Sequence, residues 1–198
     1  MKQFVSRAGQ KLEHALAVFG IDVSGAVCAD LGCSTGGFTD CLLQHGARRV
    51  YAVDTGYGVL DWKLRNDSRV VVMERTNAMH VQLPELVDWV SIDVAWTRQQ
   101  RILPAAGRLL QPGGRVISLV KPHYEAPAKL LRRGILPPEH LEQVQAAVMH
   151  DVQVAGFEVL QRTTSPIKGA KGNEEWLWLL AAINEKELEP QMHTDSHG

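Results

Sequence analysis

The hydrophobic and polar positions near the start of the chain follow the period of an amphipathic helix. Lys11 lies on this predicted helix, with Ser6 as its expected N-cap and Gly20 as its expected end. We therefore expect residues 1–20 to form a helix that packs on the main domain. Apolar or small residues recur with helical spacing at Ala8, Leu12, Ala15, Leu16 and Phe19.

Further along the chain, short apolar runs alternate with longer amphipathic stretches. This alternation of strand and helix is typical of an α/β protein with an open, mostly parallel sheet and helices on both faces. Pro104 is expected to bend one predicted helix or to mark its start. The predicted strands cover residues 26–31, 48–54, 69–74, 87–94, 113–122, 157–165 and 174–183, and the predicted helices cover 37–46, 98–110 and 137–156.

The last two predicted strands follow each other with no helix between them, which favours an antiparallel hairpin at one edge of a seven-stranded sheet. Trp176 and Trp178 alternate with Leu177 and Leu179, and this predicts two differently packed faces and a core position for both tryptophans. We expect residues 21–184 to form the main domain and residues 185–198, which are charged and contain proline, histidine and glycine, to be a flexible tail.

The composition fits one domain in a reducing compartment. With 198 residues and 45% hydrophobic content, the chain can bury a sizeable core without covalent support. Cys28, Cys33 and Cys41 lack the paired spacing of a zinc site or a disulfide framework, so neither a bound metal nor a disulfide is expected. No segment approaches the roughly 18 apolar residues of a membrane span, and we expect a cytoplasmic protein.

The charge balance limits how a nucleic acid could be bound. The formal net charge is −1 and the isoelectric point is near 6.7. A protein that holds nucleic acid by overall charge is strongly basic. Any such partner must therefore be held by a local basic patch.

A glycine-rich turn, "DLGCSTGGF", joins the first predicted strand of the sheet to the next helix. In an open α/β sheet, ligands bind beyond the carboxyl ends of the strands, where the strand order reverses, and the first strand usually marks that point. Gly32 allows a sharp turn off the strand, and Gly36 and Gly37 allow the backbone to approach a ligand closely. Ser34 and Thr35 add hydroxyl groups.

The acids around this turn favour one ligand over another. The glycine spacing differs from that of a dinucleotide site, and the Asp30 carboxylate would repel a pyrophosphate but suit the amino group of S-adenosylmethionine. Asp54, which ends the second strand of the sheet, can accept two ribose hydroxyls. We therefore expect S-adenosylmethionine rather than NAD, although a glycine turn can also be only a tight connection.

Charged residues at other strand ends could catalyse methyl transfer to a hydroxyl group. Such an acceptor needs a base near its proton, and a lysine can serve when a neighbouring cation or burial lowers its pKa. Lys121 and Asp93 end adjacent predicted strands, and Lys11 and Glu175 could reach the same edge. Two lysines and two carboxylates would form a nearly neutral network, although each residue alone could be an ordinary surface ion.

Several motifs in order resemble the methyltransferase part of the TlyA (hemolysin A) proteins, within the FtsJ-like RNA 2′-O-methyltransferases. They include "SRAGQKL", "DLGCSTGGFTD", "SIDV", "LVKP" and "GNEEWLWLL", within residues 4–183. The resemblance implies a Rossmann-like class I methyltransferase fold. It implies a catalytic set of Lys11, Asp93, Lys121 and Glu175, with Glu174 as an alternative to the last. It also implies donor contacts at Gly32, Ser34, Thr35, Gly37, Phe38 and Asp54, and at Thr76 or Asn77 near the adenine.

The acceptor side departs from the family pattern. Trp96, His123 and Tyr124 replace smaller or different residues after "SIDV" and "LVKP", and these aromatic side chains could stack on a base or simply pack at the edge of the site. RNA contact is expected at Lys129, Arg132 and Arg133, although a solvated helix face would have the same sequence. Further candidates for RNA contact are Arg98, Arg101 and Lys168.

The family's small RNA-binding domain would precede "SRAGQKL", and this sequence starts only a few residues before that motif. The sequence therefore leaves open whether a different acceptor or a partner protein takes the place of that domain. The leading hypothesis is ribosomal RNA ribose 2′-O-methylation. The alternatives are O-methylation of a small molecule and a non-enzymatic, hemolysin-like binding role, for which no membrane-directed segment is evident.

Overall fold

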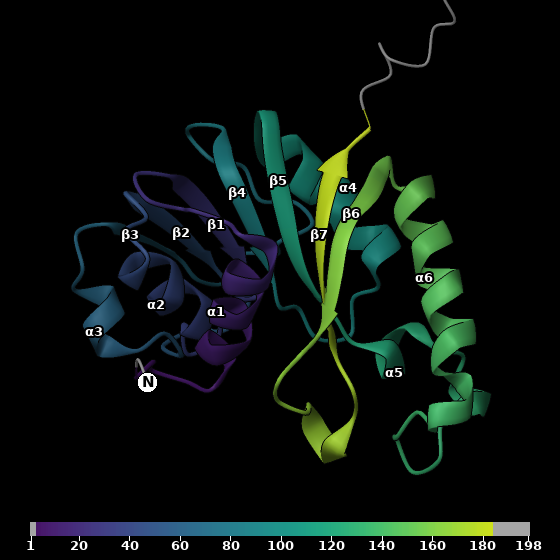
Figure 1. Ribbon diagram of the computed structural model, residues 1–198. Helices are drawn as coiled ribbons and strands as arrows, with labels where there is room; N and C mark the ends of the chain where they lie inside the picture. The colour runs from purple at the N-terminus through teal and green to yellow at the C-terminus, as the bar shows by residue number, and fades with distance from the viewer. Residues whose placement is uncertain (1–2, 184–198) are drawn as a thin grey trace, which may run out of the picture.

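A seven-stranded sheet forms the centre of the computed structural model, which describes residues 3–183 (Figure 1). The strand order is β3-β2-β1-β4-β5-β7-β6, and β7 is antiparallel to both of its neighbours while the other pairs are parallel. The predicted fold class and the edge hairpin are confirmed. The strands are β1 (Val27–Leu31), β2 (Arg49–Val53), β3 (Val70–Met73), β4 (Val87–Ile92), β5 (Leu110–Val120), β6 (Phe157–Thr164) and β7 (Trp176–Ala182).

Helices cover both faces of the sheet. One apolar core lies between the sheet and the helices α1, α2 and α3, and a second core lies on the opposite face under α4 and α6 (Figure 1). The helices are α1 (Ala8–Phe19), α2 (Gly37–Gln44), α3 (Trp62–Arg65), α4 (Gln99–Leu109), α5 (Pro122–Glu125) and α6 (Leu141–Val154), with short 3-10 turns η1 (Ala128–Leu130), η2 (Pro138–His140) and η3 (Ala170–Gly172).

Strand β7 shows how the period-2 pattern divides the two cores. Trp176 and Trp178 face the core under α4 and α6, whereas Leu177 and Leu179 face the core under α1 and α2. The two indole rings stack with centroids 6.0 Å apart. The predicted core position of both tryptophans is confirmed, and the alternation arises because successive side chains of a strand point to opposite faces.

Several helix boundaries differ from the sequence prediction; the helix expected at 137–156, for example, is preceded by η2 and begins at Leu141. The expected N-cap Ser6 is wrong, because α1 begins at Ala8 after Arg7 and has no side-chain cap, while Gly20 ends the helix in the left-handed conformation as expected. Pro104 lies inside α4 and does not mark its start. The predicted tail, residues 185–198, lies outside the described residues.

The carboxyl ends of the parallel strands lie at the lower edge of the sheet in Figure 1. Helix α1 packs against α2 and β7 close to this edge, and the connection between β6 and β7 also reaches it. Among the residues described, no helix is long and apolar enough to cross a bilayer.

Candidate functional site

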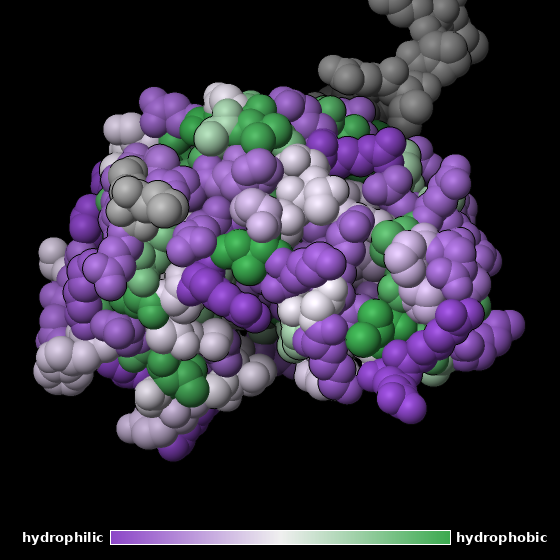
Figure 2. All heavy atoms as spheres, turned by 60° about the horizontal axis from the view of Figure 1, so that its bottom comes forward, coloured by the Kyte–Doolittle hydropathy of each residue, from purple (hydrophilic) through white to green (hydrophobic). Residues whose placement is uncertain are grey.

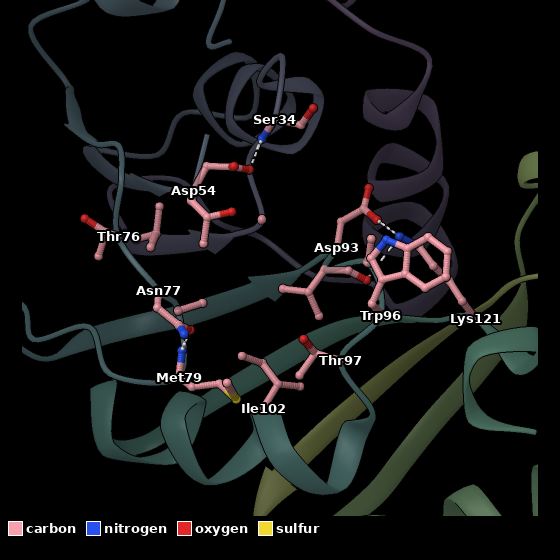
Figure 3. Close-up of a pocket in the computed structure, with 16 residues that line it drawn as sticks. Ser34, Asp54, Thr76, Asn77, Met79, Asp93, Trp96, Thr97, Ile102 and Lys121 are labelled. Atoms are coloured by element: carbon pink, nitrogen blue, oxygen red, sulfur yellow. Dashed lines mark hydrogen bonds and ion pairs between the residues drawn. The ribbon is translucent and has the colours of Figure 1, made fainter. Parts of the chain in front are cut away.

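A cavity of about 480 Å³ lies at the carboxyl ends of the strands. It lies at the ends of β1 and β4. The strand order reverses there, because β2 and β3 lie on one side of β1 and β4 and β5 lie on the other. Figure 3 shows Ser34 and Asp54 on one side of this cavity and Asp93, Lys121 and Trp96 on the other. The position predicted from the glycine turn is therefore a real cavity of ordinary ligand size.

The glycine-rich turn is fixed by the strands on either side of it. The backbone N–H groups of Gly32 and Cys33 both donate to the Val53 carbonyl of β2, at 2.9 and 3.1 Å. Gly32 has a φ of +87°, and a Cβ atom there would lie 2.8 Å from the Asp93 carbonyl oxygen. No larger residue can take this position without displacing the end of β4, so the turn presents bare backbone to the cavity.

Asp54 connects the glycine turn to the loop after β2. Its carboxylate accepts a hydrogen bond from the Ser34 N–H at 2.9 Å and another from the Gly56 N–H at 2.7 Å. Ser34 has a φ of +50°, which is an unfavourable conformation for a residue with a side chain and which this hydrogen bond holds in place. Each carboxylate oxygen has a second acceptor position that a ribose hydroxyl could use.

Thr76 and Asn77 line the same cavity, after β3. The Thr76 hydroxyl donates to the Glu74 carbonyl at 3.0 Å, and the Asn77 side-chain oxygen accepts the Met79 N–H at 2.9 Å. Asn77 therefore caps the next turn and also forms part of the cavity wall, and its expected contact with the adenine stays a prediction.

A second, smaller cavity of about 240 Å³ adjoins the first through Gly32, Ser34 and Asp93. Thr35, Phe38 and Lys11 line it. The N-terminal helix therefore contributes directly to the site.

Two residues expected at the donor lie behind the cavity walls. Asp30 is fully buried and accepts hydrogen bonds from the hydroxyls of Thr39, at 2.7 Å, and Ser91, at 3.1 Å. Burial raises its pKa to about 7. Gly37 packs against the start of α1, where a Cβ atom would lie 2.8 Å from the Gly9 nitrogen. Neither residue lines either cavity.

Gly36, expected to allow close approach of a ligand, serves a packing contact. It has a φ of +102°, and a Cβ atom there would lie 2.7 Å from the Leu60 side chain. Its conformation is needed for the turn and for packing against the segment before α3.

The four charged residues expected to act together form two ion pairs. The Lys121 Nζ lies 2.6 Å from the Asp93 Oδ1 and donates to the Val94 carbonyl at 3.2 Å. The Lys11 Nζ lies 2.5 Å from the Glu175 Oε2, with side chains only 8% and 3% exposed. Asp93 lines both cavities, Lys121 lines the first and Lys11 the second, so the two pairs lie around one site.

The neighbouring residue Glu174 points elsewhere. Its carboxylate accepts a hydrogen bond from the Trp176 indole N–H at 2.7 Å. The geometry therefore places Glu175, rather than Glu174, against Lys11.

An aromatic cluster borders the site on the α5 side. The Trp96 and Tyr124 ring centroids are 4.8 Å apart, and those of His123 and Tyr124 are 4.1 Å apart. Trp96 is 82% exposed and lies between the first cavity and a third one of about 520 Å³. His123 is buried, and this burial lowers the pKa of its imidazole. The positive charge of the nearby Lys121 lowers the same pKa further.

Sequence reasoning missed one buried acid beside this cluster. The Glu125 carboxylate accepts the N–H of Gln99, the first residue of α4, at 3.0 Å. Burial raises its pKa to about 7. Glu125 thus connects α5, which carries His123 and Tyr124, to the start of α4. The loop that carries Trp96 ends at that point. The only signal in the sequence was an acid four residues after Lys121.

The residues expected to contact RNA are exposed but differ in position. Arg98 lines the third cavity, and Arg132 pairs with Glu139 at 3.1 Å. Figure 2 shows strongly hydrophilic side chains gathered at the right of the face that carries the strand ends, and the central part of this face is hollowed. The remaining candidates, Arg101, Lys129, Arg133 and Lys168, are all exposed.

Within residues 3–183, no group of three or more histidine, cysteine, aspartate or glutamate side chains is arranged to hold a metal ion. The three cysteines are buried.

Known proteins resemble this chain over most of its length. Residues 4–181 match the model of the FtsJ-like methyltransferases. Hemolysin A of Brachyspira hyodysenteriae is 42% identical, over 88% of this chain and 75% of that protein. The 16S/23S rRNA (cytidine-2′-O)-methyltransferase TlyA of Mycobacterium tuberculosis is 39% identical, over 97% of this chain and 75% of that protein. A solved structure from Streptococcus thermophilus, 42% identical, covers 93% of this chain and 69% of its own, with a TM-score of 0.88. The resemblance inferred from the motifs is confirmed.

Proposed function

We propose that this chain, which belongs to the FtsJ-like methyltransferase family, transfers a methyl group from S-adenosylmethionine to the ribose 2′-hydroxyl of a nucleotide in ribosomal RNA. The observation that carries the proposal is the Asp93–Lys121 ion pair, at 2.6 Å, on the wall of a cavity suited to the donor. The rRNA methyltransferase named above, similar over almost the whole chain, supports the choice of acceptor.

The cavity residues suit S-adenosylmethionine. Bare backbone at Gly32 and the carboxylate of Asp54 face the same space, and Asn77 contributes an amide to the wall of that cavity. In the proposal, Asp54 accepts the ribose hydroxyls and Asn77 or Thr76 contacts the adenine, while Asp30 and Gly37 support the turn from behind. The residues proposed to contact the donor are Gly32, Ser34, Thr35, Phe38, Asp54, Thr76 and Asn77.

When bound, S-adenosylmethionine supplies an electrophilic methyl group. Lys121, which Asp93 and the Val94 carbonyl hold in place as an ammonium, must first release one proton to solvent. Its neutral Nζ then accepts the proton of the attacking 2′-hydroxyl while the methyl group passes to the 2′-oxygen. The Asp93 carboxylate then stabilises the ammonium group that forms. The Lys11–Glu175 ion pair holds Lys11 in the wall of the second cavity. With Asp93 and Lys121, the two pairs contain two positive and two negative groups.

The acceptor nucleotide would enter beside the aromatic cluster. Trp96 presents an exposed ring next to Lys121, and in the proposal this ring stacks on a splayed base, with Tyr124 and His123 behind it. Lys129, Arg132 and Arg133, with Arg98 closer to the site, would neutralise phosphates of the same RNA.

Replacing the base tests the mechanism. Lys121→Met should abolish methylation of ribosomal RNA, measured with labelled donor and nucleoside analysis for 2′-O-methylation, while donor affinity measured by calorimetry stays near that of the wild type. Arg115→Met, on the far end of the same strand β5, is the matched control and should retain activity.

Retained turnover in Lys121→Met would contradict the assigned base. Label found only in small molecules with the wild-type protein would instead favour the alternative acceptor, a small-molecule hydroxyl.

A further inference from the structure

An exposed surface beside the donor cavity takes no part in the reaction described above. Tyr57 and Trp62 are 71% and 76% exposed, and among the described aromatic residues only Trp96 at the acceptor side is as open to solvent. Tyrosine and tryptophan are enriched at interfaces, because each has an apolar ring and a polar group, and two such rings exposed in one short segment make this region a candidate contact surface. We call this region the Tyr57–Trp62 surface, and it consists of Tyr57, Val59, Trp62, Lys63 and Arg75.

The surface is held in a fixed shape by the loops that also build the donor cavity. The Arg75 N–H donates to the Gly56 carbonyl at 3.1 Å, and the Thr76 N–H donates to the Asp54 carbonyl at 2.9 Å. Behind it, the Asp61 N–H donates to the Thr35 carbonyl at 3.0 Å. The exposed rings are therefore carried on ordered backbone that is connected to the glycine turn.

The acids of this region are used internally, whereas its cations face outward. Glu74, with a side chain 8% exposed, accepts the Gly58 N–H at 2.9 Å and pairs with Arg65. The Asp61 carboxylate caps α3 through the Lys63 N–H at 2.8 Å. The Lys63 side chain is 67% exposed, and its ammonium lies 3.4 Å from the buried Asp40 carboxylate of α2. The Arg75 guanidinium lies 4.2 Å from the centroid of the Tyr57 ring.

Exposed aromatic faces next to cations are the chemistry that binds single-stranded nucleic acid. Every base offers a face for stacking, and each phosphate offers a negative charge to a lysine or an arginine. Arg75 has a φ of +52°, an unfavourable conformation that places its guanidinium over Tyr57. The exposed Arg75 side chain, and the Lys63 side chain beside it in this surface, carry the cationic groups that can contact phosphates.

We propose that the Tyr57–Trp62 surface binds a single-stranded segment of the RNA substrate, on the opposite side of the site from the basic residues after α5. Tyr57 and Trp62 stack on bases, and Lys63 and Arg75 contact phosphates. Helices α3 and α5 lie on opposite sides of the strand ends in Figure 1, so the acceptor nucleotide lies between two anchored segments. This inference rests on the proposed RNA substrate.

The test separates stacking from charge. In Tyr57→Ala/Trp62→Ala, the affinity for a fluorescently labelled mixed-sequence single-stranded RNA, measured by anisotropy, should fall by about tenfold or more, because each stacked base contributes roughly 1–3 kcal/mol. The slope of log affinity against log salt should stay as in the wild type. In Lys63→Gln/Arg75→Gln, that slope should become shallower by about 0.7 for each phosphate that the variant no longer neutralises.

Two controls guard against a merely structural effect. Tyr57→Phe/Trp62→Phe keeps both aromatic faces and should retain affinity. Leu86→Ala removes a side chain that is 53% exposed, before β4 at the far end of the sheet, and should leave binding unchanged. Donor affinity and kcat should stay near wild type in the double alanine variant, and the KM for ribosomal RNA should rise.

Several outcomes would overturn the inference. One is wild-type RNA affinity in the double alanine variant, and another is a loss of donor affinity, which would make the surface part of the donor site. Loss of binding to intact ribosomal subunits with unchanged binding to the deproteinised RNA would assign the surface to a ribosomal protein. If the wild-type protein neither binds nor methylates RNA, the proposed function itself fails.

Discussion

Replacing Lys11 with methionine would leave the Glu175 carboxylate buried without its cation. The two side chains are 8% and 3% exposed, and their charged atoms lie 2.5 Å apart. Breaking a buried ion pair by removing one partner costs about 3–5 kcal/mol, because the remaining charge is desolvated and uncompensated. This cost is a large fraction of the roughly 5–15 kcal/mol by which a domain is stable.

The complementary variant Glu175→Gln should destabilise the protein by a similar amount, because the Lys11 ammonium then lacks its counter-charge. In Lys11→Met/Glu175→Gln no buried charge remains, so the double variant should be destabilised by at least about 2 kcal/mol less than the sum of the single variants. The pair joins α1 to the start of β7 across 164 residues of sequence, so its loss should affect global unfolding.

Urea unfolding followed by tryptophan fluorescence measures these free energies. Arg132→Met is the control: the Arg132–Glu139 pair spans 3.1 Å between side chains that are 76% and 52% exposed, so its loss should cost less than about 1 kcal/mol. Additive effects of the two single variants, or single costs no larger than that of the control, would refute the reasoning.

Two further predictions concern Glu125 and Gly32. Burial raises the pKa of Glu125 from 4.5 to about 7, so the folded protein holds this proton more tightly than the unfolded chain. The free energy of unfolding should therefore fall as the pH rises from about 4.5 to 7, by up to about 3 kcal/mol, and urea titrations at several pH values should show that Glu125→Gln lacks this part of the slope. Gly32→Ala should weaken donor binding at least tenfold by calorimetry, because its Cβ would lie 2.8 Å from the Asp93 carbonyl oxygen. Gly113→Ala, with a similar φ of +82° and open space around it, controls for backbone strain, and equal donor affinity in both variants would contradict this explanation.

Local sequence patterns were sufficient to predict the sheet. The alternation of Trp176 and Trp178 with Leu177 and Leu179 predicts that β7 is buried on both faces, because the period of side chains along a strand depends on backbone geometry alone. The glycine turn and the acid at Asp54 similarly predict the position of a cavity at the strand ends. Helix ends were less predictable: α1 begins without the side-chain cap expected from Ser6.

Adjacent residues with the same chemistry could not be separated from sequence. Glu174 and Glu175 are both glutamates at the start of β7, and only the packing of α1 against this strand brings Glu175 to Lys11. Asp30 stands next to the glycine turn in sequence, yet its side chain points toward Thr39 of α2 and Ser91 of β4. In each case, the direction of the side chain and the elements that cover it decide its environment.

The sequence by itself determined the strands, the order of strand and helix, the glycine turn and the residue types available for methyl transfer, because these follow from periods and motifs within short segments. Only the tertiary structure decided which charges pair, which acid is withdrawn from the site and which rings stay exposed beside it. Those outcomes depend on contacts between distant segments, such as α1 with β7 and α5 with α4, whose energies no local pattern contains.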